Sequence, residues 1–175
     1  MALRRFCSVA VLAGCMWGAS VSAGFAAKDA ATTTSGLPLP RYVSLKSDHV
    51  NVRAGPTKDN DVAWVFTRSG LPVEITAEFE NWRRVRDSEG AEGWVYHSLL
   101  SGRRTAVITM KTRDELAPLY DRADQASAVS ARLQAGVVAQ VKRCAAGWCR
   151  VTGNGFDGWI EQQRLWGVYA DEKVE

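Results

Sequence analysis

The chain has 175 residues, of which 46% are hydrophobic and 23% are charged, a composition typical of a globular protein rather than a disordered one. Its 22 basic and 19 acidic side chains are interspersed and leave a net charge of +3, which argues against nucleic acid as the main partner. Two histidines and four cysteines leave little material for a metal site or a catalytic dyad, so neither a metal nor a cofactor is expected.

A secretory signal peptide is predicted for residues 1–23, because a basic start precedes the apolar run Phe6–Val21 and the small residues Val21-Ser22-Ala23. The run is short for a bilayer, whose span takes roughly 20 apolar residues, so no membrane span is expected after processing. Leu12-Ala13-Gly14-Cys15 also resembles a lipoprotein box, which leaves a lipid anchor at Cys15 open. A periplasmic or secreted location follows from either interpretation.

A flexible linker is predicted for residues 24–40, where small and polar residues with two prolines show no apolar period. From Arg41 onward the chain changes to short segments separated by turn residues. In Pro72–Phe79, apolar and polar side chains alternate, as they do in a strand with one buried face. This spacing predicts an all-β barrel or sandwich.

The chain then repeats itself, which predicts two copies of one small β-domain, residues 41–103 and 105–169, followed by a tail, residues 170–175. Four matches recur in order at an offset of 65 or 66 residues: Gly70 with Gly136, Trp82-Arg83-Arg84-Val85 with Trp148-Cys149-Arg150-Val151, Gly93-Trp94-Val95 with Gly158-Trp159-Ile160, and Leu99–Gly102 with Arg164–Gly167.

These motifs resemble those of the bacterial SH3-like family. The first copy has the family's Asn-Val-Arg strand and Gly-Pro turn within Val50–Pro56, a glycine before a long strand, a tryptophan that opens the next strand, and a Gly-Trp-Val hairpin. The second copy lacks the Asn-Val-Arg and Gly-Pro parts. Its Cys-x4-Cys segment and its ending, Leu165–Val168, resemble an exported tandem subgroup from alpha-type proteobacteria. The resemblance implies two tandem SH3-like barrels that bind cell-wall peptides or proteins, often beside a hydrolase, although no hydrolase domain is recognised in this sequence.

The candidate ligand site lies in the first copy, which keeps the family's opening loop. Arg53 could hold a peptide carboxylate with its guanidinium fork, and the aromatic side chains could form a shallow groove for a peptide. The alternative is structural: the tryptophans pack a small core, and the loop residues serve the turn, with Gly55 supplying a positive φ. The candidate residues are Asn51, Arg53, Trp82, Trp94 and Tyr96.

A disulfide is predicted between Cys144 and Cys149. Val137–Arg143 and Trp148–Thr152 indicate a hairpin in which the two cysteines face each other near its mouth. An even pair of cysteines in an exported chain fits this reading, while a redox pair and free thiols remain open.

The sequence therefore predicts a non-catalytic envelope binding module whose partner is a peptidoglycan peptide or an envelope protein. A structural adaptor that scaffolds a partner without wall binding is the alternative. An enzyme with an unrecognised site is a third possibility, although no Ser-His-Asp set, phosphate loop or Gly-x-Ser-x-Gly motif is found.

Overall fold

A computed structural model describes residues 33–110 and 115–175. The predicted signal peptide, Cys15 and the first part of the predicted linker, residues 24–32, lie outside the described residues.

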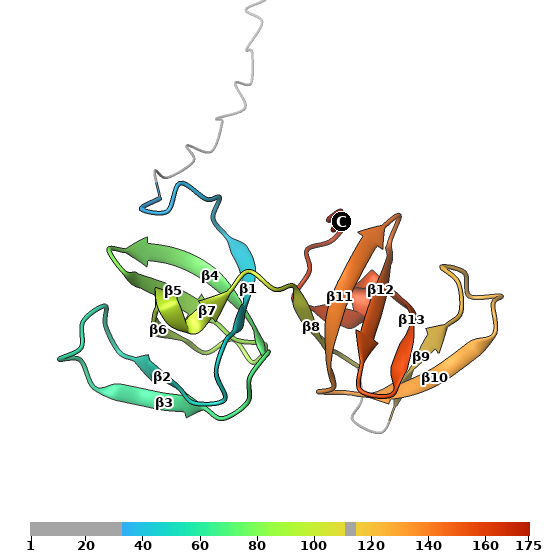
Figure 1. Cartoon of the computed structure of the whole chain (residues 1–175), viewed down its shortest axis with the longest axis horizontal. Coiled ribbons are helices and arrows are strands. Elements are labelled where there is room, and N and C mark those ends of the chain that lie inside the picture. Colours follow the sequence, from blue (N-terminus) through green and yellow to red (C-terminus); the bar gives the residue numbers. More distant parts are fainter. Residues whose placement is uncertain (1–32, 111–114) are drawn as a thin grey trace, which may run out of the picture.

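The first half of the chain forms one antiparallel sheet of seven strands in the order β3-β2-β6-β5-β4-β1-β7, bent around its own core (Figure 1). One short 3₁₀ helix, η1, precedes the last strand. The elements are β1 (Arg41–Leu45), β2 (Val50–Arg53), β3 (Val62–Phe66), β4 (Pro72–Phe79), β5 (Trp82–Arg86), β6 (Glu92–Tyr96), η1 (His97–Leu99) and β7 (Leu100–Ser101).

The second half builds the same sheet again, in the order β10-β9-β13-β12-β11-β8-β14. Each strand occupies the place of its counterpart in the first sheet, so both the all-β prediction and the repeat are confirmed. The elements are β8 (Thr105–Ile108), β9 (Leu116–Tyr120), β10 (Val129–Gln134), β11 (Val138–Ala145), β12 (Trp148–Gly153), β13 (Phe156–Glu161), η2 (Gln162–Arg164) and β14 (Leu165–Trp166).

Each sheet encloses a separate apolar core, because period-2 alternation turns every second side chain inward. On β2, Val50 and Val52 are buried while Asn51 between them is exposed. On β12, Cys149 and Val151 are buried while Arg150 is exposed.

The disulfide between Cys144 and Cys149 is confirmed. The two residues face each other across the β11–β12 hairpin with their Cα atoms 4.1 Å apart, and both are buried in the second core. The turn consists of Ala146 and Gly147, both with positive φ, as a two-residue hairpin turn requires. This turn geometry fixes the register that brings the cysteines together.

Residues 33–40 contact the first sheet, whereas the sequence places them in the flexible linker. The backbone N–H and the hydroxyl of Ser35 donate to the Glu78 carboxylate at 2.8 and 2.7 Å, and Leu39 packs against the first core. Glu78 lies 43 residues from Ser35 in the sequence, so no local sequence pattern predicts this contact.

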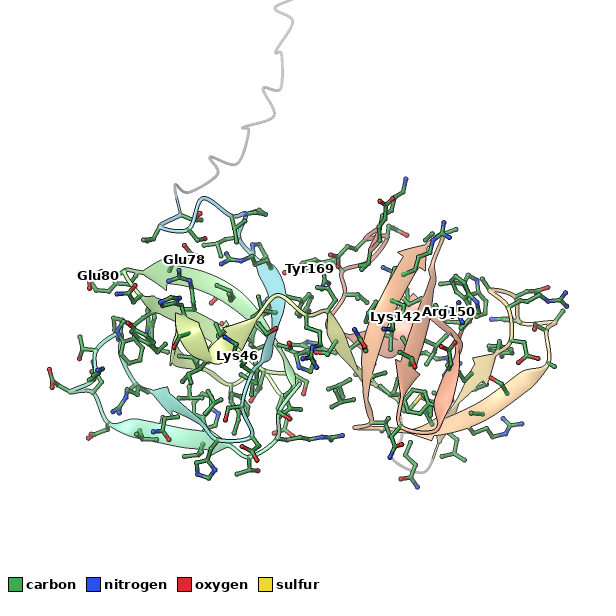
Figure 2. The ribbon with its side chains drawn as sticks, in the orientation of Figure 1. Lys46, Glu78, Glu80, Lys142, Arg150 and Tyr169 are labelled. Atoms are coloured by element: carbon green, nitrogen blue, oxygen red, sulfur yellow. A yellow bond between two sulfur atoms is a disulfide. The ribbon has the colours of Figure 1, made fainter. Side chains whose placement is uncertain are left out.

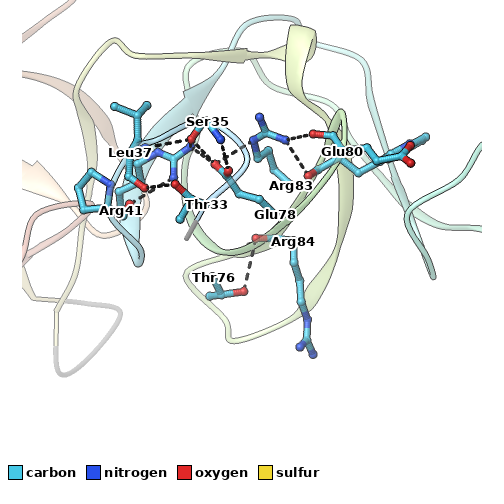
Figure 3. A network of polar contacts seen from close by, with 11 residues as sticks. Thr33, Ser35, Leu37, Arg41, Thr76, Glu78, Glu80, Arg83 and Arg84 are labelled. Atoms are coloured by element: carbon cyan, nitrogen blue, oxygen red, sulfur yellow. Dashed lines mark hydrogen bonds and ion pairs between the residues drawn. The ribbon is translucent and has the colours of Figure 1, made fainter. Parts of the chain in front are cut away.

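Glu78 is the centre of a polar network that joins this segment to β1 and β5 (Figure 3). Its carboxylate also pairs with Arg41 at 2.6 Å and Arg83 at 3.1 Å, and its side chain is only 1% exposed. Burial opposes ionisation, but the hydrogen bonds from Ser35 and Arg41 and the charge of Arg83 outweigh it and lower the pKa of Glu78 to about 2.

The C-terminal residues are also part of the fold, although the sequence leaves residues 170–175 as a tail. Val174 forms a two-way backbone pair with Cys144 and is buried in the second core. The side-chain amide of Gln162 donates to the carbonyls of Tyr169 and Glu172 at 2.7 and 3.1 Å. These two bonds hold the turn between Tyr169 and Glu172 in place.

The two sheets lie side by side (Figure 1). Aromatic residues pack against one another where they meet. The Tyr42 ring on β1 lies 5.1 Å from that of Trp166 and 4.6 Å from that of Tyr169. The Tyr169 hydroxyl, which lies between the two sheets in Figure 2, donates to the buried Glu74 carboxylate at 2.9 Å. Burial, with the hydrogen bond to Glu74, raises the pKa of Tyr169 well above its ordinary value, so the hydroxyl remains a donor at neutral pH.

A charged pair reinforces this junction. Arg104, in the segment between the sheets, forms a two-pronged contact with Glu172 at 2.7 and 3.0 Å and also donates to the Gly167 carbonyl. Bidentate arginine–carboxylate pairs restrict geometry strongly, so this contact helps to fix how the segment runs between the sheets.

Candidate functional site

The predicted ligand residues of the first copy gather on the outer face of its sheet. Arg53 on β2 lies directly opposite Trp94 on β6, which in turn lies opposite Arg84 on β5. Directly opposed residues on neighbouring strands project to the same side, so the three side chains form one row across the sheet. The three side chains line up because of the register in which β2 pairs with β6 and β6 pairs with β5.

A second row lies beside the first. Trp82 on β5 is paired with Tyr96 on β6 and, across the two-residue turn, with Phe79 on β4. The rings of Trp82 and Tyr96 meet edge to face at 5.4 Å. Trp82 is only 8% exposed, whereas Tyr96 and Trp94 are partly exposed and Phe79 is 49% exposed. Trp82 therefore acts as a packing support, and the rings around it are accessible.

Gly93 explains why a glycine precedes Trp94. A Cβ atom at Gly93 would lie 2.4 Å from a methyl carbon of Val52 and 3.1 Å from the Arg53 carbonyl oxygen. Only glycine lets β2 approach β6 this closely, and that approach puts Arg53 beside Trp94. The Gly-Trp motif is thus a geometric requirement of the face.

Arg53, which is half-buried, also has a structural contact. Its Nη1 atom donates to the Asn60 carbonyl at 2.6 Å and so holds the loop between β2 and β3. Gly55 in this loop does not have the positive φ that the sequence reading assigned to it. A side chain there is instead excluded by Asn60, whose amide would lie 2.6 Å from the added Cβ atom.

Asn51 stands two residues before Arg53 on the same side of β2 and is exposed. The structure thus places all five candidate residues on one face, with Asn51 at its edge. Sequence reasoning missed Phe79 as an exposed aromatic beside Trp82. The signal was available, because Phe79 directly precedes the Glu80-Asn81 turn that pairs it with Trp82.

The second copy keeps the strand pairing and the two tryptophans of this face, but different side chains stand at the positions of Arg53 and Tyr96. Tyr120 occupies the place of Arg53 opposite Trp159, and Glu161 occupies the place of Tyr96 opposite Trp148. The Tyr120 ring meets Trp148 edge to face at 5.6 Å, so a tyrosine supports the tryptophan in both copies but comes from a different strand. The other position of the pair, which does not hold the tyrosine, is Arg53 in the first copy and Glu161 in the second, so it is basic in one copy and acidic in the other.

A groove of about 590 Å³ lies beside Trp148, between the β9–β10 loop and the C-terminal turn. Asp124, Glu161 and Asp171 line it, and no basic side chain does so among the described residues. A hydrogen bond from Arg164 lowers the pKa of Glu161, so its carboxylate is ionised at neutral pH. The two copies thus present equivalent faces of different charge.

Two classes of feature are absent from the described residues 33–110 and 115–175. No cluster of three or more His, Cys, Asp or Glu side chains with metal-binding geometry occurs there. The same residues contain no helix long and apolar enough to cross a membrane.

Comparison with known proteins identifies the family. The bacterial SH3 domain matches the chain twice, at residues 46–102 and 113–167, which together are more than half of its length. The chain belongs to the bacterial SH3 domain family. Bacterial SH3 domains are generally binding modules, and this chain carries two of them in tandem.

Two solved structures are similar to the tandem bacterial SH3 domains, and both are from Trichomonas vaginalis. NlpC2 is 16% identical with a TM-score of 0.33, and the match covers 73% of this chain and 48% of that one. NlpC1 is 14% identical with a TM-score of 0.33, and the match covers 76% of this chain and 48% of that one. The chain thus spans about half the length of either structure. No curated protein sequence matches it.

Proposed function

We propose that this tandem bacterial SH3 protein is a non-catalytic binding module of the cell envelope, periplasmic or secreted. Its ligand would be a peptidoglycan peptide or an envelope protein, held on the outer face of the first domain. The observation that carries the proposal is the row in which Arg53 lies beside Trp94, with Tyr96 in the adjoining row. A guanidinium beside partly exposed rings suits a peptide that offers both a carboxylate and apolar surface.

The charge on this face supports the assignment. Arg84 is paired with Glu92 at 2.6 Å, whereas Arg53 has no carboxylate within ion-pair distance among the described residues. One edge of the Arg53 guanidinium is engaged by the Asn60 carbonyl, and the remaining N–H groups are available to a ligand. The buried ring of Trp82 packs edge to face against that of Tyr96. Asn51 would contact the ligand at the edge of the face.

An envelope location agrees with the Cys144–Cys149 bond, because disulfides persist in oxidising compartments. A structural adaptor remains the second candidate function. It is favoured by the docking of the two domains through Tyr42, Trp166 and Tyr169, which gives a partner protein one continuous surface.

Co-sedimentation with purified sacculi tests the first candidate. Arg53→Gln and Tyr96→Ala should each weaken binding about tenfold, which corresponds to about 1.4 kcal/mol. Arg132→Gln and Leu116→Ala change exposed residues of the second domain in the same way and should leave binding unchanged. Because Arg53 also holds a loop, the fold of each variant is checked by circular dichroism.

Undiminished binding by both site variants would contradict the proposed face. Absence of any binding to sacculi by the wild-type protein would instead favour the adaptor function. In that case, loss of an envelope partner when either domain is expressed alone is the expected result.

A further inference from the structure

A polar cleft lies between the two domains, away from the face described above. Its volume is about 500 Å³, which is in the range of small-ligand sites. The first domain supplies its walls from the ends of β1 and β7 and from the β3–β4 turn, and the second supplies β8, β11 and β12. Neither domain forms this cleft alone.

The cleft is positively charged. Lys46 and Arg103 both line it, and no acidic side chain does so among the residues described. Both are exposed, and neither takes part in an ion pair within residues 33–110 and 115–175. Lys46 makes one long contact, from Nζ to the Ser98 carbonyl at 3.4 Å. Two unpaired cations in a recess favour an anionic ligand.

The wall also holds unused hydrogen-bonding groups. Thr105 is 5% exposed, and its hydroxyl oxygen has no hydrogen-bond partner. Gln140 lines the same cleft. Buried polar groups without partners are rare in folded proteins and suggest that something else supplies the bond.

Contacts between the two domains fix the walls of the cleft relative to each other. The Tyr169–Glu74 hydrogen bond joins the domains on one side, and the Arg104–Glu172 pair holds the segment between them against the C-terminal residues. The Arg68 guanidinium donates to the Gly136 carbonyl at 3.2 Å and bridges them again. A recess whose walls are fixed from both domains is organised before a ligand arrives, which lowers the entropy cost of binding.

We propose that this interdomain cleft binds a short peptide through its carboxylate. Lys46 and Arg103 receive the carboxylate, and the unpartnered Thr105 hydroxyl and Gln140 bond the peptide groups. A peptide is favoured over a simple anion because the cleft offers both donors and acceptors beyond its two cations. None of the five residues of the outer face lines the cleft, so the inference stands apart from the proposed function.

The test is an NMR titration of the full chain with N-acetyl-alanyl-alanine and, separately, with the same peptide amidated at its C-terminus. We expect shifts of the backbone amides of Lys46, Arg103 and Thr105, and at least tenfold weaker binding of the amidated peptide. Lys46→Gln combined with Arg103→Gln should weaken binding of the free carboxylate at least tenfold. Lys58→Gln combined with Arg132→Gln removes the same charge outside the cleft and should have no effect.

Equal binding of the two peptides would overturn the proposal, as would undiminished binding by the cleft variant. Displacement of the peptide by an equal concentration of inorganic phosphate would also overturn it, because the cleft would then be a general anion site. Tyr96→Ala separates the two proposals, since it should weaken binding to sacculi and leave the titration of the cleft unchanged.

Discussion

Replacing Glu78 by glutamine removes the charge at the centre of the network that joins residues 33–40 to the first domain. The wild-type carboxylate is 1% exposed and accepts from Ser35, Arg41 and Arg83. A glutamine has nearly the same shape but cannot neutralise the two arginines. We therefore expect Glu78→Gln to destabilise the first domain at neutral pH and to loosen residues 33–40.

The magnitude follows from the pKa. A downward shift of the Glu78 pKa from 4.5 to about 2 corresponds to about 3 kcal/mol, at about 1.4 kcal/mol per unit. Because the pKa is lower in the folded state, this stabilisation is complete above pH 4.5 and is lost as the pH falls toward 2. The difference in the free energy of unfolding between the wild-type protein and Glu78→Gln should therefore shrink as the pH falls from 4.5 toward 2.

Urea unfolding of both proteins between pH 7 and pH 2 measures this difference. Glu89→Gln removes an exposed carboxylate from a turn of the same domain and controls for net charge. If the free-energy difference between wild type and Glu78→Gln stayed constant from pH 7 to pH 3, the assigned pKa and its cause would be refuted.

Three further changes test the second domain and the junction. Ala146→Gly should stabilise the hairpin by about 1 kcal/mol in thermal unfolding, since Ala146 has a φ of 50° that favours glycine; an unchanged melting temperature would contradict this. Replacing both Cys144 and Cys149 by serine should cost at least about 2 kcal/mol in urea unfolding, the value expected for a short closed loop, and thiol titration of the denatured wild-type protein should find neither cysteine free. Tyr169→Phe should destabilise the junction by about 2 kcal/mol, because it leaves the buried Glu74 carboxylate short of a donor. Limited proteolysis should then cut faster between the domains, and Tyr120→Phe, which changes a ring packed against Trp148 away from the junction, should not change the cleavage rate.

Local patterns were sufficient for the fold. The alternating sequence of Pro72–Phe79 and the turn glycines Gly70 and Gly136 extend over a few residues, so they predict a strand and its turns without knowledge of the partner strand. In the structure the first four residues of this strand, Glu74 included, are all buried, and Phe79 is exposed. The repeat added a second, independent copy of the same signals. The cysteine pair was predictable for the same reason, because a two-residue turn sets the register of the strands on either side.

The candidate site could be predicted only in part. The sequence named Arg53, Trp94 and Tyr96, but it could not place them in adjoining rows, because that depends on how β2 pairs with β6 across about 40 residues of chain. It also could not distinguish the buried Trp82 from its more accessible neighbours. Whether this face binds a ligand is a prediction that the sacculus experiment addresses.

The sequence by itself determined two all-β domains, their order and one disulfide, since each of these follows from periodicity, turns and spacing along the chain. Only the tertiary structure decided that residues 33–40 dock on Glu78, that the C-terminal residues complete the second core, and that the two domains meet through Tyr42 and Tyr169. These contacts join residues as far as 127 positions apart, as in the pair of Tyr42 and Tyr169, and they depend on the burial of charged and aromatic groups. No short sequence window contains both partners of such a contact, which is why the cleft between the domains is visible only in the folded chain.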